Sequence, residues 1–291
     1  MRLVFLGTPE PAVPSLEALV AAGHDVVCVV TRPDRRRGRG SELSPSPVKA
    51  AALAHGIPVV HHVRDLEGVE AELGVVVAYG AMIPEAVLNR IPMLNVHFSL
   101  LPRWRGAAPV ERAILAGDTH TGVGIMSLEV TLDTGPVHAE VKVPVAEKTA
   151  SALTAELAQR GAALLVEVLA SPDRLQHARV QKGTPTYAEK LTSETFHLTP
   201  TMTPTEAHRV VRLERAWCHV AGKRFRVLSA QGGRDDATTT PGLVVAFGPH
   251  VGLALSGGVL WLDRVQAEGG RPMEAAAWWA GARLASDATW S

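Results

Sequence analysis

The chain has 291 residues, of which 46% are hydrophobic and 20% are charged, proportions typical of a soluble globular protein and not of an intrinsically disordered one. The length favours two domains over a single large one. Lys and Arg number 29 and so do Asp and Glu, so a polyanionic partner must be held by a local patch of charge and not by the net charge of the protein.

The N-terminus begins with a short apolar strand, predicted over residues 2–6. Gly7, Pro9 and Pro11 interrupt it too early for the apolar region of a signal peptide, and no run approaches the roughly 20 apolar residues of a membrane span. Cys28 and Cys218 form neither a disulfide framework nor a metal-ligand spacing. We therefore expect a cytoplasmic protein. We also expect a monomer.

Short apolar strands then alternate with helical stretches through the first two thirds of the chain. The strands are predicted over residues 25–31, 57–61, 75–78 and 94–98, and the helices over 15–22, 47–55, 107–116 and 150–170. This alternation predicts an α/β fold with a doubly wound, mostly parallel, Rossmann-like sheet. In such a sheet the site lies at the carboxyl ends of the strands.

The pattern changes after Leu198, where a Thr- and Pro-rich segment is typical of a linker. A helix is expected over residues 205–213, and short strands follow at 217–220, 224–228, 243–247, 251–255 and 259–262. This spacing predicts a small C-terminal β-barrel, with an OB-like fold as one option. We therefore expect a catalytic domain over 1–190, a linker over 191–204 and a barrel domain over 205–291.

The strand predicted at residues 94–98 carries two polar side chains, Asn95 and His97, on one face, because side chains alternate along a strand. An amide and an imidazolium can donate hydrogen bonds to the oxyanion that develops when an amine attacks a carbonyl carbon. Asp133, in a turn, is a carboxylate that can orient the imidazole or relay the proton of the amine. Each residue alone more often has a plain structural role, as a turn cap, a satisfied core histidine or an Asx-turn.

Several stretches together resemble the folate-dependent formyltransferases. They are FLGTPE (5–10), PSPVK (45–49), VVVAYG (75–80), NVHFSLLPRWRGAAP (95–109), AGDTHTGVGIM (116–126) and LDTG (132–135). The resemblance implies that Asn95, His97 and Asp133 act in the transfer of the formyl group. It also implies that 10-formyltetrahydrofolate is the co-substrate and that Ser99, Leu100, Leu101 and Pro102 line its site.

The identity of the acceptor depends on other stretches, because relatives that formylate amino sugars share the Asn, His and Asp set. Residues 103–109, the PSPVK segment and a second domain resemble the tRNA-directed subfamily. The resemblance thus implies formylation of the α-amino group of methionyl initiator tRNA, for translation initiation. The alternatives are a formyltransferase acting on a sugar nucleotide or another small amine, and a non-catalytic tRNA-binding protein.

A basic segment lies just after the second predicted strand. It carries five arginines, Arg32, Arg35, Arg36, Arg37 and Arg39, against one acidic residue, Asp34, which gives a local charge of +4. Arginines in a glycine-containing loop near the presumed site can bind phosphates. The resemblance implies that Arg35, Arg36, Arg37 and Arg39 contact tRNA. A solvated loop without a partner is the alternative.

Two further classes are disfavoured. The residues after Gly7 lack the other glycines of a dinucleotide-binding turn, so a nicotinamide-dependent oxidoreductase is not expected. The histidines outside the candidate site show no metal-ligand spacing, so no metal is expected.

Overall fold

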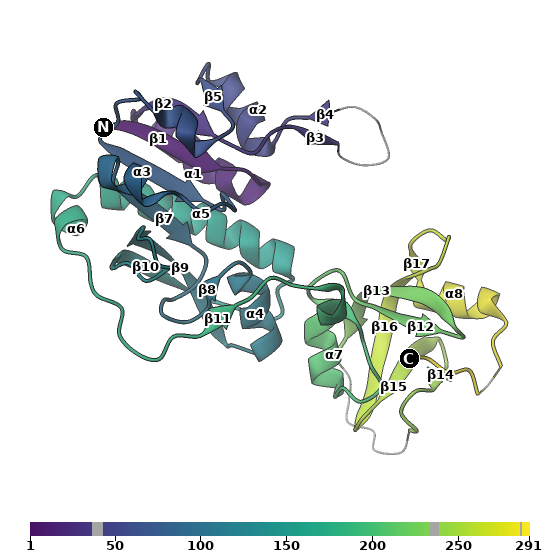
Figure 1. Ribbon diagram of the computed structural model, residues 1–291. Helices are drawn as coiled ribbons and strands as arrows, with labels where there is room; N and C mark the ends of the chain where they lie inside the picture. Colours follow the sequence, from purple (N-terminus) through teal and green to yellow (C-terminus); the bar gives the residue numbers. More distant parts are fainter. Residues whose placement is uncertain (37–42, 233–238, 286) are drawn as a thin grey trace. The chain divides into compact units, whose positions relative to one another are not determined.

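The computed structural model describes residues 1–36, 43–232, 239–285 and 287–291 (Figure 1). Contacts divide the chain into two compact units. The N-terminal unit comprises residues 1–110, 119–145 and 153–189, and the C-terminal unit comprises 111–118, 146–152 and 190–291. No helix in the described part of the chain combines the length and the hydrophobicity that a bilayer crossing requires.

A seven-stranded sheet forms the centre of the N-terminal unit. Its strands, in spatial order, are β10 (Val137–Pro144), β9 (His120–Ser127), β7 (Met93–His97), β6 (Leu73–Val77), β1 (Arg2–Gly7), β2 (Asp25–Val30) and β5 (Val59–Val60). The five strands from β7 to β5 pair in parallel, whereas β9 runs antiparallel to β7 and β10 antiparallel to β9. The predicted mostly parallel sheet is confirmed, but the two antiparallel strands were not predicted.

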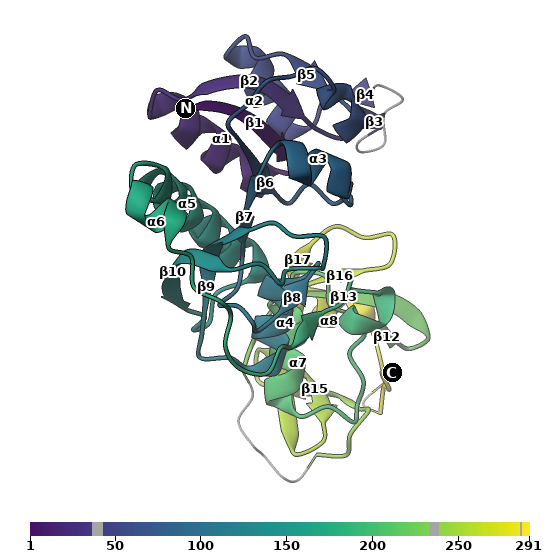
Figure 2. The same cartoon turned by 60° about the vertical axis from the view of Figure 1, so that its left-hand side comes forward.

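Helices cover this sheet. They are α1 (Val13–Ala21), α2 (Pro47–Ala54), α3 (Glu85–Arg90), α5 (Ala150–Leu169) and α6 (Pro172–Gln176), with the 3-10 turns η1 (Glu10–Ala12) and η2 (Val63–Leu66). The long α5 runs beside β7 and β9 (Figures 1 and 2), and Gly161 lets it approach closely. A Cβ atom on Gly161 would lie 2.8 Å from Val96 and 2.9 Å from Val123. Val96 therefore faces α5, and its neighbours Asn95 and His97 face the opposite side of the sheet.

The order of the strands reverses between β1 and β6. From β1 the chain proceeds outward through β2 and β5, and it then returns to β6 on the other side and proceeds to β7. Ligands in open α/β sheets bind at the carboxyl ends of the strands beside such a reversal. The strands on either side of the reversal end at Gly7 and Val77, and His97 ends the neighbouring strand β7.

Two small strand pairs extend from this edge. The hairpin of β3 (Arg35–Arg36) and β4 (Leu43–Ser44) follows β2. The second pair is parallel and joins β8 (Arg105–Gly106) to β11 (Tyr187–Ala188), which are far apart in the sequence (Figure 1).

A six-stranded antiparallel sheet dominates the C-terminal unit. Its strands are β12 (Trp217–Val220), β13 (Lys223–Gln231), β16 (Gly258–Ala267), β15 (His250–Leu255) and β14 (Val244–Phe247), with β17 (Met273–Glu274) paired to β16. The remaining elements are α4 (Pro109–Ala116), η3 (Ser193–Phe196), α7 (Pro204–Val211) and α8 (Ala275–Ala282). Helix α7 begins at Pro204 because Thr203 and Glu206 bond to each other's backbone amides at 3.3 and 2.8 Å.

The last residues of the chain join the two edge strands of this sheet. On the β12 side, the amide of Ala221 donates to the carbonyl of Thr289 at 3.0 Å. On the β14 side, the amide of Val244 donates to the carbonyl of Ala288 at 2.8 Å, and Trp290 donates to Gly242 at 2.8 Å. These bonds close the curled sheet, so the small barrel predicted from the sequence is confirmed, and residues 288–291 complete it.

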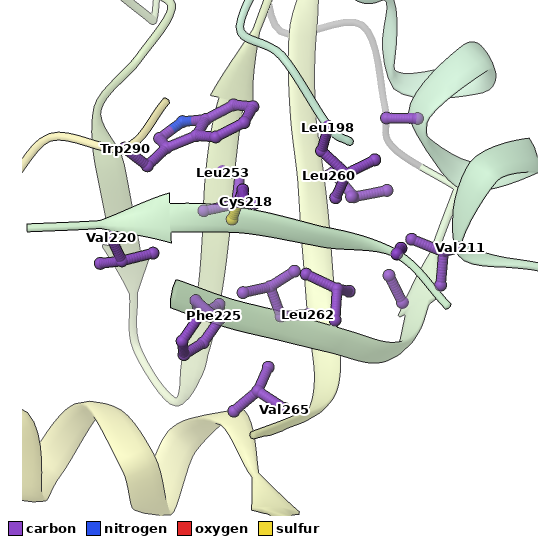
Figure 3. Packing of buried hydrophobic residues seen from close by; sticks show 14 of the residues in the cluster. Leu198, Val211, Cys218, Val220, Phe225, Leu253, Leu260, Leu262, Val265 and Trp290 are labelled. Carbon is purple, nitrogen blue, oxygen red and sulfur yellow. The ribbon is translucent and has the colours of Figure 1, made fainter. Parts of the chain in front are cut away.

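Apolar side chains from β12, β13, β14, β15 and β16 fill the interior of the closed sheet (Figure 3). Trp290 is 3% exposed, and its indole N–H donates to the carbonyl of Ala254 at 3.2 Å. Phe225 packs against Trp278 of α8 with ring centroids 4.5 Å apart. Burial raises the pKa of the Cys218 thiol to about 12, so this cysteine is a packing residue and not a nucleophile.

Removing the Trp290 ring should destabilise the barrel strongly. We expect Trp290→Ala to lower the free energy of unfolding by about 3–5 kcal/mol, because it creates a cavity and loosens the closing segment. Denaturant unfolding followed by circular dichroism measures this loss. The matched control is Phe247→Ala, since Phe247 is 77% exposed and its loss should change stability by less than about 0.5 kcal/mol. Equal effects of the two changes would contradict the closing role of Trp290.

A histidine on α7 makes the stability of the C-terminal unit depend on pH. Burial lowers the pKa of His208 below its ordinary value, and the nearby Glu147 carboxylate, 3.5 Å away, opposes this shift only partly. The unfolded chain therefore binds more protons at this residue than the folded chain does in the window just below the ordinary pKa. Stability contributed by neutral His208 is thus present above this window and is lost as the pH falls through it.

We expect His208→Gln to weaken the acid-induced loss of stability, because glutamine does not titrate. Melting temperatures of the wild type and the variant, taken from about pH 7.5 to about pH 5.5, test this expectation. Parallel curves for the two proteins would show that His208 does not contribute to the pH dependence.

Candidate active site

Strand β7 brings Asn95 and His97 to the same face of the sheet. All five residues of β7 are buried, and Asn95 is 9% and His97 5% exposed. Across the antiparallel pairing, His97 lies opposite Gly124 of β9. A Cβ atom on Gly124 would make only ordinary contacts, at 3.7–3.8 Å, with Ala139, Ser99 and Val137.

Asp133 comes from the loop that joins β9 to β10. Its carboxylate Oδ2 accepts a hydrogen bond from the amide of Gly106 at 2.8 Å and lies 3.7 Å from His97 Nδ1. The Asp133 and His97 side chains are only 8% and 6% exposed. The structure thus brings His97 together with Asp133, which lies in a loop 36 positions later in the chain, and Asn95 shares the His97 face of β7.

The other imidazole nitrogen is held by the backbone. His97 Nε2 lies 2.9 Å from the carbonyl oxygen of Trp104. A carbonyl only accepts hydrogen bonds, so Nε2 carries a proton and Nδ1 is the nitrogen that faces Asp133. Trp104 has a φ of 62°, in the left-handed region that non-glycine residues seldom occupy. The sequence did not reveal this contact, because a backbone carbonyl leaves no trace in residue identity.

Glycines shape both loops of the site. Gly106 has a φ of 117°, and a Cβ atom there would lie 2.8 Å from the carbonyl oxygen of Ala188. A Cβ atom on Gly135 would overlap the carbonyl of Ser127. Asp133 itself has a φ of 50°, a conformation that Asp tolerates better than most residues. Backbone geometry therefore requires glycine at positions 106 and 135.

The segment expected to line the folate site forms a compact turn directly after β7. Ser99 is fully buried, and its hydroxyl donates to the carbonyl of Arg103 at 2.5 Å. Leu100 packs onto Gly122, where a Cβ atom would overlap its side chain. Leu101 packs with Met126 and Val137, and a cis peptide bond joins it to Pro102. Ser99, Leu100, Leu101 and Pro102 thus lie between β7 and the loop that supplies Trp104.

Two arginines of the basic segment lie in the described strand β3. Arg35 is exposed and pairs with Ser44, and Arg36 pairs with Leu43. Arg37 and Arg39 lie outside the described residues.

The base of the basic segment is held by the PSPVK stretch. Lys49 Nζ lies 2.7 Å from Asp34 Oδ2, and both side chains are largely buried. Ser46 caps α2 by accepting from the amide of Lys49 at 3.0 Å and bonds to the Thr31 hydroxyl at 2.8 Å. The single acidic residue of the segment is therefore neutralised by Lys49.

Two family descriptions match the chain. Residues 1–169 match Formyl transferase, and residues 190–283 match Formyl transferase, C-terminal domain. Among proteins of known sequence, the chain is 44% identical to the methionyl-tRNA formyltransferase of Thiobacillus denitrificans over 304 aligned residues, 98% of each chain. It is 47% identical to the methionyl-tRNA formyltransferase of Novosphingobium aromaticivorans over 266 residues, 85% of this chain and 88% of the relative.

Solved structures share the fold at lower sequence identity. WlaRD, a sugar 3N-formyl transferase, superposes with a TM-score of 0.68 at 15% identity, over 90% of this chain and 97% of that one. HypX from Aquifex aeolicus in complex with tetrahydrofolic acid superposes with a TM-score of 0.63 at 16% identity, over 95% of this chain and 46% of that one. The family matches span most of the sequence and the relatives cover nearly all of it, and the chain therefore belongs to the formyl transferase family.

Proposed function

We propose that this protein transfers the formyl group of 10-formyltetrahydrofolate to the α-amino group of methionyl initiator tRNA in the cytoplasm, for translation initiation. The observation that carries the proposal is the buried Asp133 and His97 pair, 3.7 Å apart, beside Asn95. It occurs in a chain 44% identical, over 98% of its length, to a methionyl-tRNA formyltransferase. A carboxylate, an imidazole and an amide are the groups that acyl transfer to an amine requires.

The chemistry follows from the atoms that each residue has available. The amine nitrogen attacks the formyl carbon, the new N–C bond forms, and the carbonyl electron pair moves onto oxygen. The side-chain amide of Asn95 donates to this oxyanion. His97 Nε2 is already engaged by the Trp104 carbonyl, so Nδ1 is the imidazole nitrogen that takes part.

Asp133 has two roles in this scheme. Its carboxylate lies 3.7 Å from Nδ1 and orients the imidazole of His97, which is a second donor to the oxyanion when Nδ1 carries a proton. It also accepts the proton that the attacking amine loses. That proton goes to N10 of tetrahydrofolate as the C–N10 bond breaks, which leaves the formylated amine and restores the site.

The acceptor is tested directly with purified protein and 10-formyltetrahydrofolate. We expect formyl transfer to methionyl initiator tRNA and none above background to an amino sugar nucleotide. If formyl transfer occurs only to the sugar nucleotide, the reaction is as proposed but the acceptor is wrong. If it occurs to neither acceptor, the remaining alternative is a tRNA-binding protein without this activity.

Asn95→Ala should lower kcat by a factor on the order of 10²–10³, because one donor to the oxyanion is lost. Binding of methionyl-tRNA should stay within about twofold of the wild type, since Asn95 acts after binding. Asn89→Ala is the matched control, because Asn89 is an exposed residue of α3. Normal turnover of Asn95→Ala would remove Asn95 from the mechanism.

We further propose that Arg35, Arg36, Arg37 and Arg39 bind the phosphates of the tRNA. Replacing all four with Ala should weaken tRNA binding and flatten its salt dependence, because each lost phosphate contact removes about 0.7–0.9 from the slope of log K against log salt concentration. Filter binding at several salt concentrations measures both effects. The KM for 10-formyltetrahydrofolate should not change. Unaltered tRNA affinity would refute this role.

Asp34→Asn is a control that separates net charge from loop geometry. It makes the basic segment more positive but breaks the 2.7 Å ion pair with Lys49. If net charge alone set the affinity, this variant would bind tRNA more tightly. Because the ion pair fixes the base of the hairpin, we expect weaker binding instead, and Lys49→Met should show the same weakening.

A further inference from the structure

The residues after α6 return to the site and bond to both loops that build it. We call residues 179–188 the return segment. Arg179 exchanges two backbone hydrogen bonds with Val137, at 2.8 Å each, just after the loop of Asp133. Farther along, β11 of the return segment pairs with β8, and the amide of Ala107 donates to the carbonyl of Ala188 at 2.8 Å. The return segment is therefore attached at one end to the Asp133 loop and at the other to the loop of Trp104 and Gly106.

Gln181 is the side chain that connects these two attachments. Its Nε2 donates to the carbonyl oxygens of Asp133 and Gly135, at 2.8 Å each. Its Oε1 accepts two hydrogen bonds from Arg105, at 3.1 Å from Nε and 2.6 Å from Nη2. Both N–H groups of the Gln181 amide thus donate to the Asp133 loop, and its oxygen accepts from Arg105 of β8.

The two carbonyls that Gln181 binds flank a strained turn. Asp133 has a φ of 50° and is followed at two residues by Gly135, whose position allows no side chain. Left-handed conformations of non-glycine residues are uncommon and persist where their surroundings hold them. Bonds from one amide group to both Asp133 and Gly135 hold this turn and so fix the direction in which the Asp133 carboxylate points.

A second contact of the return segment acts on the other side of His97. The Thr186 hydroxyl accepts from the amide of Trp104 at 2.9 Å, and the amide of Arg105 donates to the carbonyl of Thr186 at 2.8 Å. These bonds fix the peptide whose carbonyl binds His97 Nε2. The return segment thereby positions both partners of the imidazole.

We propose that Gln181 is a positioning residue for formyl transfer, which acts by holding the Asp133 carboxylate beside His97. The inference rests on the proposed function and adds to it a residue that touches neither the imidazole nor the Asp133 carboxylate. Misplacement of a reacting group by about 1 Å can cost on the order of 10²-fold in rate. Loss of the two donors of Gln181 should therefore lower kcat and leave substrate binding nearly intact.

Three variants separate the parts of this role. Gln181→Met removes all four hydrogen bonds at nearly constant volume. Gln181→Glu keeps an acceptor for Arg105 but has no donor for the two carbonyls. Lys182→Met is the control, because Lys182 is the exposed neighbour in the same segment. We expect kcat to fall about 10- to 100-fold in both Gln181 variants, with both KM values within about threefold of the wild type, and no change in the control.

A double-mutant cycle with Asp133→Asn shows whether Gln181 acts through Asp133. If it does, adding Gln181→Met to Asp133→Asn should lower kcat by less than about twofold further, because the group that Gln181 positions is already disabled. If kcat of the double variant instead falls by the product of the two single-variant factors, the two residues act independently. That result would indicate general destabilisation and overturn the proposal. A Gln181→Glu variant with wild-type kcat would also overturn it, since the pairing with Arg105 would then be sufficient.

The proposed function and this inference fail in different ways. If wild-type protein transfers no formyl group to methionyl-tRNA, the function is wrong. If the wild type is active and Gln181→Met is equally active, only the positioning role is wrong. Melting temperatures of all variants accompany the kinetics, and a Gln181→Met variant that is slow but melts within a few degrees of the wild type supports the proposal.

Discussion

The buried carboxylate of Asp133 is the group on which the geometry of the candidate site depends. It lies almost out of solvent, where a charge is costly unless hydrogen bonds and an opposite charge compensate for it. The Gly106 amide supplies the hydrogen bond, and His97 lies close enough to supply the charge when it is protonated. Because Gly106 and Asp133 come from different loops, satisfying this carboxylate also fixes the two loops relative to β7.

That arrangement uses backbone conformations that side chains disfavour. Asp133 and Trp104 both have positive φ, and Gly106 occupies a position where a Cβ atom would press on the return segment. The rigid part of the fold supports this strain. Strand β7 is buried along its length between β6 and β9, and Gly161 of α5 lets the helix pack directly against its far face. A rigid strand and a strained loop together place an imidazole and a carboxylate within a few ångströms.

In the C-terminal unit, the main structural requirement is that the edges of the sheet be paired. An open curled sheet would leave the edges of β12 and β14 unpaired, and unpaired edges invite association with other chains. Residues 288–291 pair with both edges, and Trp290 fills the interior behind them. A few terminal residues therefore contribute both hydrogen bonds and core volume to this unit.

The sequence by itself determined the alternation of strands and helices, the face shared by Asn95 and His97, and the small barrel, because these follow from local periodicity and from turn residues. It also pointed to the three candidate catalytic side chains through their motifs. It did not show β9, where Gly122 and Gly124 weaken the strand pattern. It also did not show β10, which was missed although apolar and polar residues alternate along it, nor the closing segment at residues 288–291. Only the tertiary structure decided that Trp104 contributes a carbonyl, that Lys49 neutralises Asp34, and that Gln181 holds the Asp133 loop. These contacts involve backbone atoms or partners distant in the chain, and such pairings are set by the packing of the whole unit and not by local sequence.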